Sequence, residues 1–106
     1  MEVDSGVITT AQNSGDATVV GLLSGLVQAL VDRPEGVLIT AIRAEQTTIL
    51  EVKVEPDDVR RIIGRKGRTA DALREILLNL GGKEGRRYLM EIIEPRGRVT
   101  VPVSFR

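Results

Sequence analysis

Two glycines that flank two cationic residues form the segment of this chain best suited to holding an anion, Gly64-Arg65-Lys66-Gly67. Glycine allows backbone angles and close approaches that a side chain would block. If a helix begins after Gly67, its first turn carries unpaired N–H groups and a positive partial charge, and both favour a phosphate. Arg68 continues the cationic run, and Arg60 and Arg61 lie one turn before it. This arrangement predicts a clamp for a phosphodiester backbone.

The glycine pair alone is a weak signal, because the chain contains 11 glycines. The simple alternative is a helix-breaking turn with solvated charges. The context favours the clamp, since Ile62-Ile63 precedes the loop and helical patterns lie on both sides of it.

Charge is distributed unevenly along a chain whose formal net charge is zero. Residues 1–59 carry three Lys or Arg against ten Asp or Glu, a net charge of −7. Residues 60–106 carry twelve against five, a net charge of +7. A polyanion would be drawn to the second half only. The alternative is that the two halves of one small domain neutralise each other, and the charge pattern leaves both interpretations open.

Composition excludes several classes of site. The chain has no Cys and no His, which rules out disulfides, thiolate zinc sites and a histidine base. Glu55, Asp57 and Asp58 could bind a hard cation, but the start of a helix explains them more simply. The Gly-rich segment at 81–85 lacks P-loop spacing, and no pair of residues forms a catalytic set. We therefore expect a binding protein without cofactor or metal, and not an enzyme.

No stretch reaches the roughly 18 apolar residues of a membrane span, and residues 1–16 lack the features of a secretory signal. We expect a cytoplasmic protein without a membrane partner, in keeping with the absence of Cys.

The helices and strands expected to position the loop follow from the spacing of apolar residues and from the residues that end helices and strands. Residues 1–15 have no period and are predicted to be a flexible tail. Asp16 is a candidate N-cap for a helix that extends to about Asp32, with a broad apolar face. Residues 37–44 and 48–54 read as strands, and the short link 45–47 favours an antiparallel hairpin. Within the helix, Gly21 and Gly25 would permit close packing on the sheet or against another subunit.

The second half supplies the remaining elements. Pro56 opens a short helix, and a second helix follows the loop over residues 68–80. Gly81-Gly82 is expected to end that helix, and the residues expected to face inward are Leu73, Ile76, Leu77 and Leu80. Residues 88–94 form a third strand, and residues 95–106 a short extra strand or a loose tail. Arg86 and Arg87 either extend the basic surface or are solvated loop charges.

The resulting order is α-β-β-α-α-β. Since the last strand returns through a helical crossover, it should lie parallel to the second strand. We predict an α+β fold with a three-stranded mixed sheet and helices packed on one face.

These residues carry a resemblance to a known family. Ile62-Ile63-Gly64-Arg65-Lys66-Gly67 resembles the signature of KH domains, and the element order resembles the type II, bacterial version. Residues 29–37 and 47–77 are similar in order and spacing to the small single-KH proteins of bacteria, the KhpA-type RNA chaperones. The resemblance covers residues 19–94. We place a KH domain at 16–94, between the tail at 1–15 and an extension at 95–106.

The resemblance implies a single-stranded RNA partner, with about four nucleotides held across the loop. Ile63 would line an apolar groove under the bases. The RNA-binding residues would be Gly64, Arg65, Lys66, Gly67, Arg68, Ile63, Arg60 and Arg61. Members of the family act as dimers or with a second KH-domain RNA-binding protein, and affect cell-envelope growth and division. An alternative function is a KH-fold module that works mainly through a partner protein. The single Tyr and single Phe argue against RNA modes that need several exposed rings.

Overall fold

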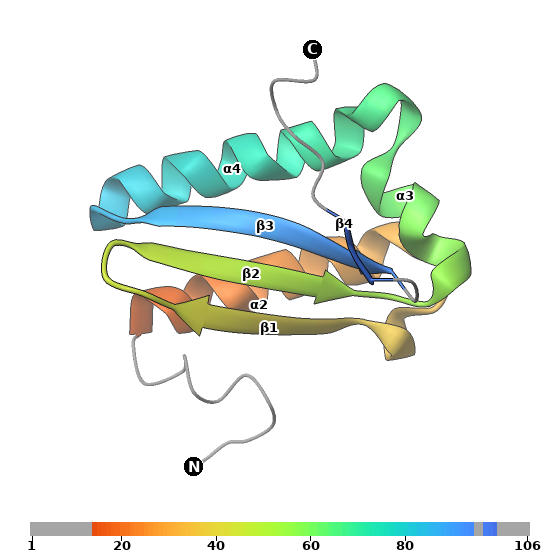
Figure 1. Ribbon diagram of the computed structural model, residues 1–106, viewed down its shortest axis with the longest axis horizontal. Helices are drawn as coiled ribbons and strands as arrows, with labels where there is room; N and C mark the ends of the chain where they lie inside the picture. Colours follow the sequence, from red (N-terminus) through yellow and green to blue (C-terminus); the bar gives the residue numbers. More distant parts are fainter. Residues whose placement is uncertain (1–13, 95–96, 100–106) are drawn as a thin grey trace.

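The computed structural model of the chain describes residues 14–94 and 97–99. Residues 1–13 of the predicted N-terminal tail lie outside this part. The described residues form three α-helices and four strands (Figure 1): α2 (Ser14–Leu30), β1 (Leu38–Arg43), β2 (Thr47–Lys53), α3 (Val59–Ile63), α4 (Arg68–Glu84), β3 (Arg87–Glu94) and β4 (Gly97–Val99). Short 3-10 helices occupy Pro34–Gly36, Pro56–Asp58 and Arg65–Gly67.

The sheet has the strand order β1-β2-β3-β4. β1 and β2 pair antiparallel, with Ile42 opposite Ile49, and β2 and β3 pair parallel, with Thr48 opposite Tyr88. The predicted hairpin and the predicted parallel crossover are both confirmed, and with them the α+β fold with a three-stranded mixed sheet. The short β4 adds an antiparallel strand beside β3, so residues 97–99 form the extra strand. Residues 100–106 lie outside the described part.

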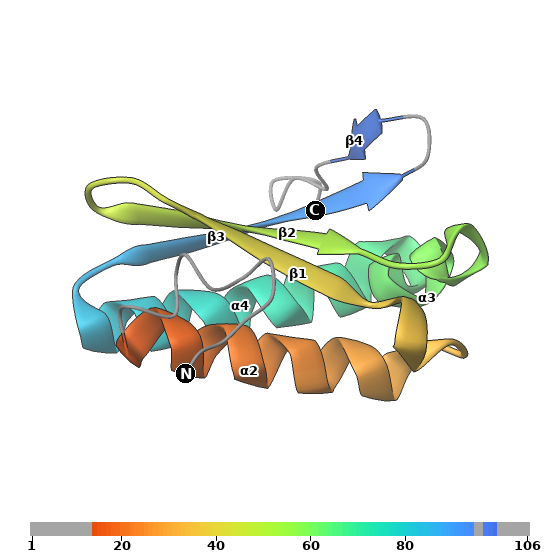
Figure 2. The ribbon, with the colours of Figure 1, turned by 90° about the horizontal axis from the view of Figure 1, so that it is seen from below.

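The molecule has two layers. Helices α2 and α4 lie side by side on one face of the sheet (Figure 2), and α3 stands at one end of this helical layer. The core lies between the layers and is built from fully buried aliphatic side chains of every major element, including Leu23, Val27, Leu50, Val52, Ile62 and Ile92. The alternation predicted for the second strand is confirmed, because Leu50, Val52 and Val54 are buried while Lys53 is exposed.

Three predictions about the helices were wrong in detail. Helix α4 continues through Gly81 and Gly82 and ends at Gly85, whose left-handed backbone (φ 73°) supplies the C-cap. Ile76 was expected in the core but is 44% exposed. It lines a groove between α4 and α2, because the two helices do not close completely over the sheet.

Asp16 was predicted to be a helix cap but is a fully buried carboxylate inside the first turns of α2. It accepts hydrogen bonds from Tyr88 Oη at 2.7 Å, Arg43 Nη1 at 2.6 Å and Thr48 Oγ1 at 3.4 Å, and pairs with the charge of Arg86 at 3.9 Å. Burial alone would raise the pKa of Asp16, but these bonds and charges outweigh it, so the pKa is lowered. The carboxylate therefore ties the start of α2 to all three long strands.

Candidate nucleic-acid interface

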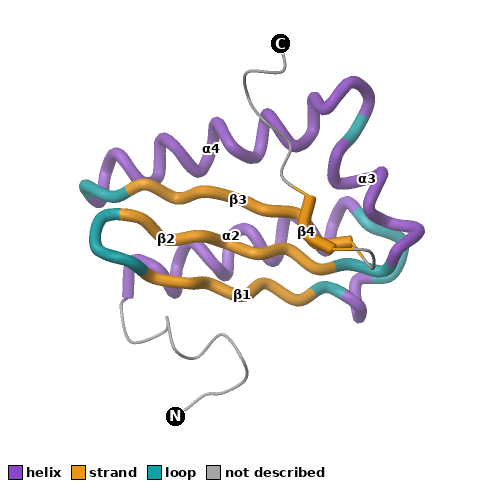
Figure 3. The backbone as a smooth tube through the Cα atoms, viewed as in Figure 1, coloured by secondary structure: helices purple, strands orange, loops and turns teal. Residues whose placement is uncertain are grey.

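Both glycines of the loop that joins α3 to α4 have a positive φ. Helix α3 ends at Gly64, which has φ 78° and donates its N–H to Arg60 O at 2.8 Å. A Cβ on Gly64 would collide with the side chain and backbone nitrogen of Thr69. Gly67 also has a left-handed backbone, with φ 76°. In Figure 3 a short teal stretch separates α3 from the helical turn that leads into α4. The backbone at Gly64 therefore approaches Thr69 more closely than any residue with a side chain would permit.

Lys66 adopts a left-handed backbone, with φ 56° and ψ 25°, although it is not glycine. This conformation costs a residue with a side chain roughly 1–2 kcal/mol. Arg65 and Lys66 are both exposed at the tip. The turn therefore holds two cationic side chains out in solvent at a cost in backbone energy, and such strain is typical of functional loops.

The turn uses some of the amide groups that the sequence suggested for a phosphate. Gly67 donates its N–H to Gly64 O at 3.1 Å, and Arg68 donates to Arg65 O. Binding of an anion here would consequently depend more on the cationic side chains and less on these two amides.

A cationic surface surrounds the loop. Residues 60–68 contain five Lys or Arg and no acidic residue, and all five side chains are exposed: Arg60, Arg61, Arg65, Lys66 and Arg68. Within this surface Arg61 Nε forms an ion pair of 3.2 Å with Asp32 Oδ2, and both side chains are exposed. Arg65, Lys66 and Arg68 therefore supply most of the field at the loop itself.

The predicted apolar residue of the site, Ile63, is partly buried and packs against the core. Its neighbour Ile62 is fully buried. Together they fix α3 to the sheet, and Ile63 keeps part of its side chain at the surface beside Gly64. The structure thus brings Ile63, the loop and the flanking arginines together at one end of the molecule.

Asp58 anchors this end, and sequence reasoning missed its contacts. The buried carboxylate of Asp58 accepts the backbone N–H groups of Asp32 at 3.0 Å and Arg33 at 3.1 Å. The sequence suggested only a favourable charge at a helix start. These contacts span more than twenty residues, so no local pattern signals them. They fix the end of α2 against α3 and bring the exposed Arg33 close to the cationic surface.

Arg86 does not belong to this surface. Its guanidinium donates to Ala44 O, Glu45 O and Thr48 Oγ1 at 2.7–3.0 Å. It therefore fastens the β1–β2 hairpin to the start of β3. Arg87 is exposed at that same end of the sheet, which Figure 1 shows opposite to α3.

Other kinds of site were also considered within the described residues. Across 14–94 and 97–99, no three acidic side chains come together in a group that could hold a metal ion, and Glu55, Asp57 and Asp58 form no such group. None of the helices in this part is long and apolar enough to cross a membrane.

Comparison with known proteins gives a consistent result. Residues 21–92 match the KhpA/KhpB KH-domain family. The chain is 40% identical over 72 residues to an RNA-binding protein KhpA of Clostridium acetobutylicum, covering 68% of this chain and 96% of that protein. It is 43% identical over 65 residues to the protein of the same name in Aquifex aeolicus (61% and 82%), and 41% identical over 73 residues to that of Borreliella burgdorferi (69% and 89%). No solved structure matches the chain.

Proposed function

The chain belongs to the KhpA/KhpB KH-domain family, and from this premise we propose that it binds single-stranded RNA through the loop Gly64–Gly67. The observation that carries the proposal is the strained turn with two exposed cations at its tip and no acidic residue between positions 60 and 68. The names of the matched relatives support RNA as the ligand.

The geometry suggests that the residues of the site have different roles in binding. Arg65, Lys66 and Arg68 would neutralise successive phosphates, while the glycines let the RNA backbone approach the turn. Ile63 would contact a base on its apolar face. Such a site grips about four nucleotides, and because most of the contacts are with the backbone, sequence preference is weak. Weak and general binding of this kind suits an RNA chaperone in the cytoplasm, and it needs no catalytic step.

Fluorescence anisotropy with a short labelled single-stranded RNA tests the proposal. If about three phosphates are neutralised, log Kobs falls with log salt with a slope of about −2. The double variant Arg65→Asp and Lys66→Asp should abolish binding, with circular dichroism to verify its fold. The matched control is Lys53→Asp on the opposite face of the sheet. Equal binding by the loop variant and the native protein would overturn the clamp. Cleavage of the RNA when divalent cations are added would overturn the view that the protein is not an enzyme.

Self-association is the second part of the proposal. Leu22 and Leu26 on α2 are 50% and 40% exposed, and a Cβ on Gly21 or Gly25 would meet nothing within 4 Å. The two glycines are therefore not needed for close packing within the described part of the chain. This favours the other explanation, close packing against another subunit. This apolar helix face suits a second copy or a second KH-domain protein. Two linked modules could gain about 10²–10⁴ in avidity on a longer RNA.

Sedimentation velocity over a range of concentrations tests this second part. Leu22→Lys should weaken self-association, whereas Leu78→Lys, an equally exposed site on α4, should leave it unchanged. A protein that stays monomeric at all concentrations would leave only the second KH-domain protein as a partner for this face. If RNA binding also fails, the chain works mainly as a protein-interaction module.

A further inference from the structure

A groove runs between α2 and α4 on the outer side of the helical layer. Its middle part has a volume of about 170 Å³ and is lined only by aliphatic side chains, among them Leu22, Leu26, Ile76 and Leu80. The first three of these are 40–50% exposed. The apolar side chains of this groove would gain free energy if an apolar segment covered them.

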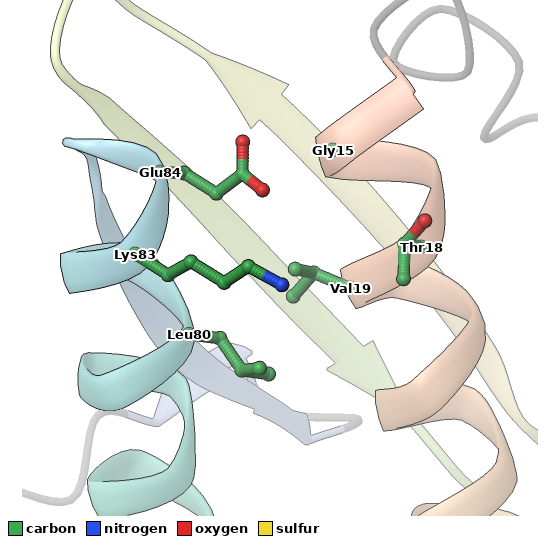
Figure 4. A pocket seen from close by; sticks show the side chains of 6 residues that line it. All are labelled: Gly15, Thr18, Val19, Leu80, Lys83 and Glu84. Carbon is green, nitrogen blue, oxygen red and sulfur yellow. The ribbon is translucent and has the colours of Figure 1, made fainter.

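The groove continues at one end into a second cavity of about 240 Å³, which shares Leu80 with the first. Figure 4 shows this cavity between the start of α2 and the end of α4, with the ammonium group of Lys83 reaching toward Val19 and the carboxylate of Glu84 toward Gly15. The groove is thus apolar along most of its length and polar at the end where α2 begins.

The chain enters α2 at this polar end. Ser14 is the first residue of the helix and Gly15 lines the cavity. Residues 1–13 precede it, and they contain three aliphatic β-branched residues (Val3, Val7 and Ile8), the acids Glu2 and Asp4, and no Lys or Arg. We propose that residues 1–13 fold back and dock in the groove between α2 and α4, with aliphatic side chains of the segment in the apolar part.

The segment is long enough for this. Thirteen extended residues reach about 45 Å, whereas the seventeen residues of α2 extend only about 25 Å. The segment must reverse direction where it leaves the helix, and Asn13 and Ser14 are residue types that favour turns. Because the family match begins at residue 21, the segment is an addition to the matched domain.

Tethering favours this segment over other occupants. A segment joined directly to the groove has an effective concentration in the millimolar range, far above that of a second copy in a micromolar solution. Since the groove includes Leu22 and Leu26, docking would also oppose the self-association proposed above. This last consequence depends on that proposal, but the docking itself does not.

A spin label in the segment tests the docking directly. The chain has no Cys, so Ser5→Cys carries a nitroxide at one defined position. Methyl NMR spectra of the full chain are compared with the nitroxide oxidised and reduced, at a concentration where sedimentation shows a monomer. We expect the methyl signals of Leu22, Leu26 and Ile76 to lose most of their intensity. Those of Ile42 and Leu89, which are exposed on the other face of the sheet, should keep theirs.

Two controls make the result decisive. Leu26→Lys should reduce the loss of signal at Leu22 and Ile76, and the matched change Leu78→Lys, at an exposed site of α4 outside the groove, should not. In a second sample, spin-labelled protein without isotopes is mixed with isotope-labelled protein that carries no nitroxide. The methyl signals should lose no intensity in this mixture. Equal effects on both faces would overturn the proposal, and a loss of signal that also appears in the mixture would assign the groove to a second copy. No RNA is present in this assay, so its failure is distinct from a failure of RNA binding.

Discussion

The hydroxyl of Tyr88 donates a hydrogen bond of 2.7 Å to the carboxylate of Asp16, a residue 72 positions earlier in the chain. Both side chains are buried. The bond joins the first helix to the last long strand, so the two ends of the domain are held by one interaction. Burial, and then the bond to Asp16, raise the pKa of Tyr88 to about 12.

This pair sets the pH range of stability. The pKa of Asp16 is lowered in the folded protein, so its contribution is present above about pH 4 and is lost as pH falls through the folded value. The pKa of Tyr88 is raised, so its contribution is complete below about pH 10 and is lost as pH rises toward 12. Urea unfolding against pH should show a plateau between these limits. Asp16→Asn should reduce the fall in unfolding free energy at acid pH. A fall as large as that of the native protein would contradict the role assigned to Asp16.

Tyr88→Phe isolates the hydrogen bond itself. The ring is kept and only the donor is lost, so the free energy of unfolding should fall by about 1.5–3 kcal/mol, the range for bonds to charged groups. Thermal unfolding at neutral pH measures it. Loss of less than about 0.5 kcal/mol, the low end for a single hydrogen bond, would mean that water replaces the hydroxyl.

Gly64→Ala should destabilise the domain by at least about 2 kcal/mol, because the new methyl group meets Thr69 and the backbone remains left-handed. Gly82 provides the contrast. It lies within α4, and a Cβ there meets nothing within 4 Å. Gly82→Ala should therefore stabilise by about 0.5–1 kcal/mol. Equal effects of the two changes in urea unfolding would refute the close approach at Gly64.

Lys66→Gly separates strain from binding. Glycine adopts the left-handed angles of position 66 freely, so the free energy of unfolding should stay the same or rise by up to about 1 kcal/mol. RNA affinity should nevertheless fall, and the log–log salt slope should become shallower by about 0.7 through the loss of one phosphate contact. Lys53→Gly, on the face of the sheet that the helices do not cover, should leave the salt slope unchanged.

Asp32→Asn removes the carboxylate that pairs with Arg61. The freed guanidinium should raise RNA affinity by about two- to fivefold at low salt, in line with the small free energy of an exposed ion pair. Anisotropy against the native protein measures the change. Glu45→Gln, an exposed acid on the distant hairpin, is the control, and an equal gain there would show that net charge alone governs affinity.

The features that were predictable from the sequence are those that depend on local pattern. The glycines of the loop, the alternation of Leu50 and Val52, and the parallel crossover all follow from periods and turn residues within a short window. The buried carboxylates of Asp16 and Asp58 were assigned to helix starts, because their true partners are distant in sequence and become neighbours only in the fold. The position of Ile76 depends on how closely α2 and α4 approach each other, which periodicity does not encode.

The long separation between Asp16 and Tyr88 also has a consequence during synthesis. At about 5–20 residues per second, roughly 4–14 s pass between the addition of Asp16 and that of its partner, a separation of 72 residues. The strand β3, which pairs with β2, is also made after the other two long strands. Helix α2 itself forms within microseconds. Its apolar side therefore remains exposed to solvent for seconds, until the sheet that covers it is complete. The half-made chain is therefore the form of this protein most exposed to aggregation and to capture by cellular chaperones.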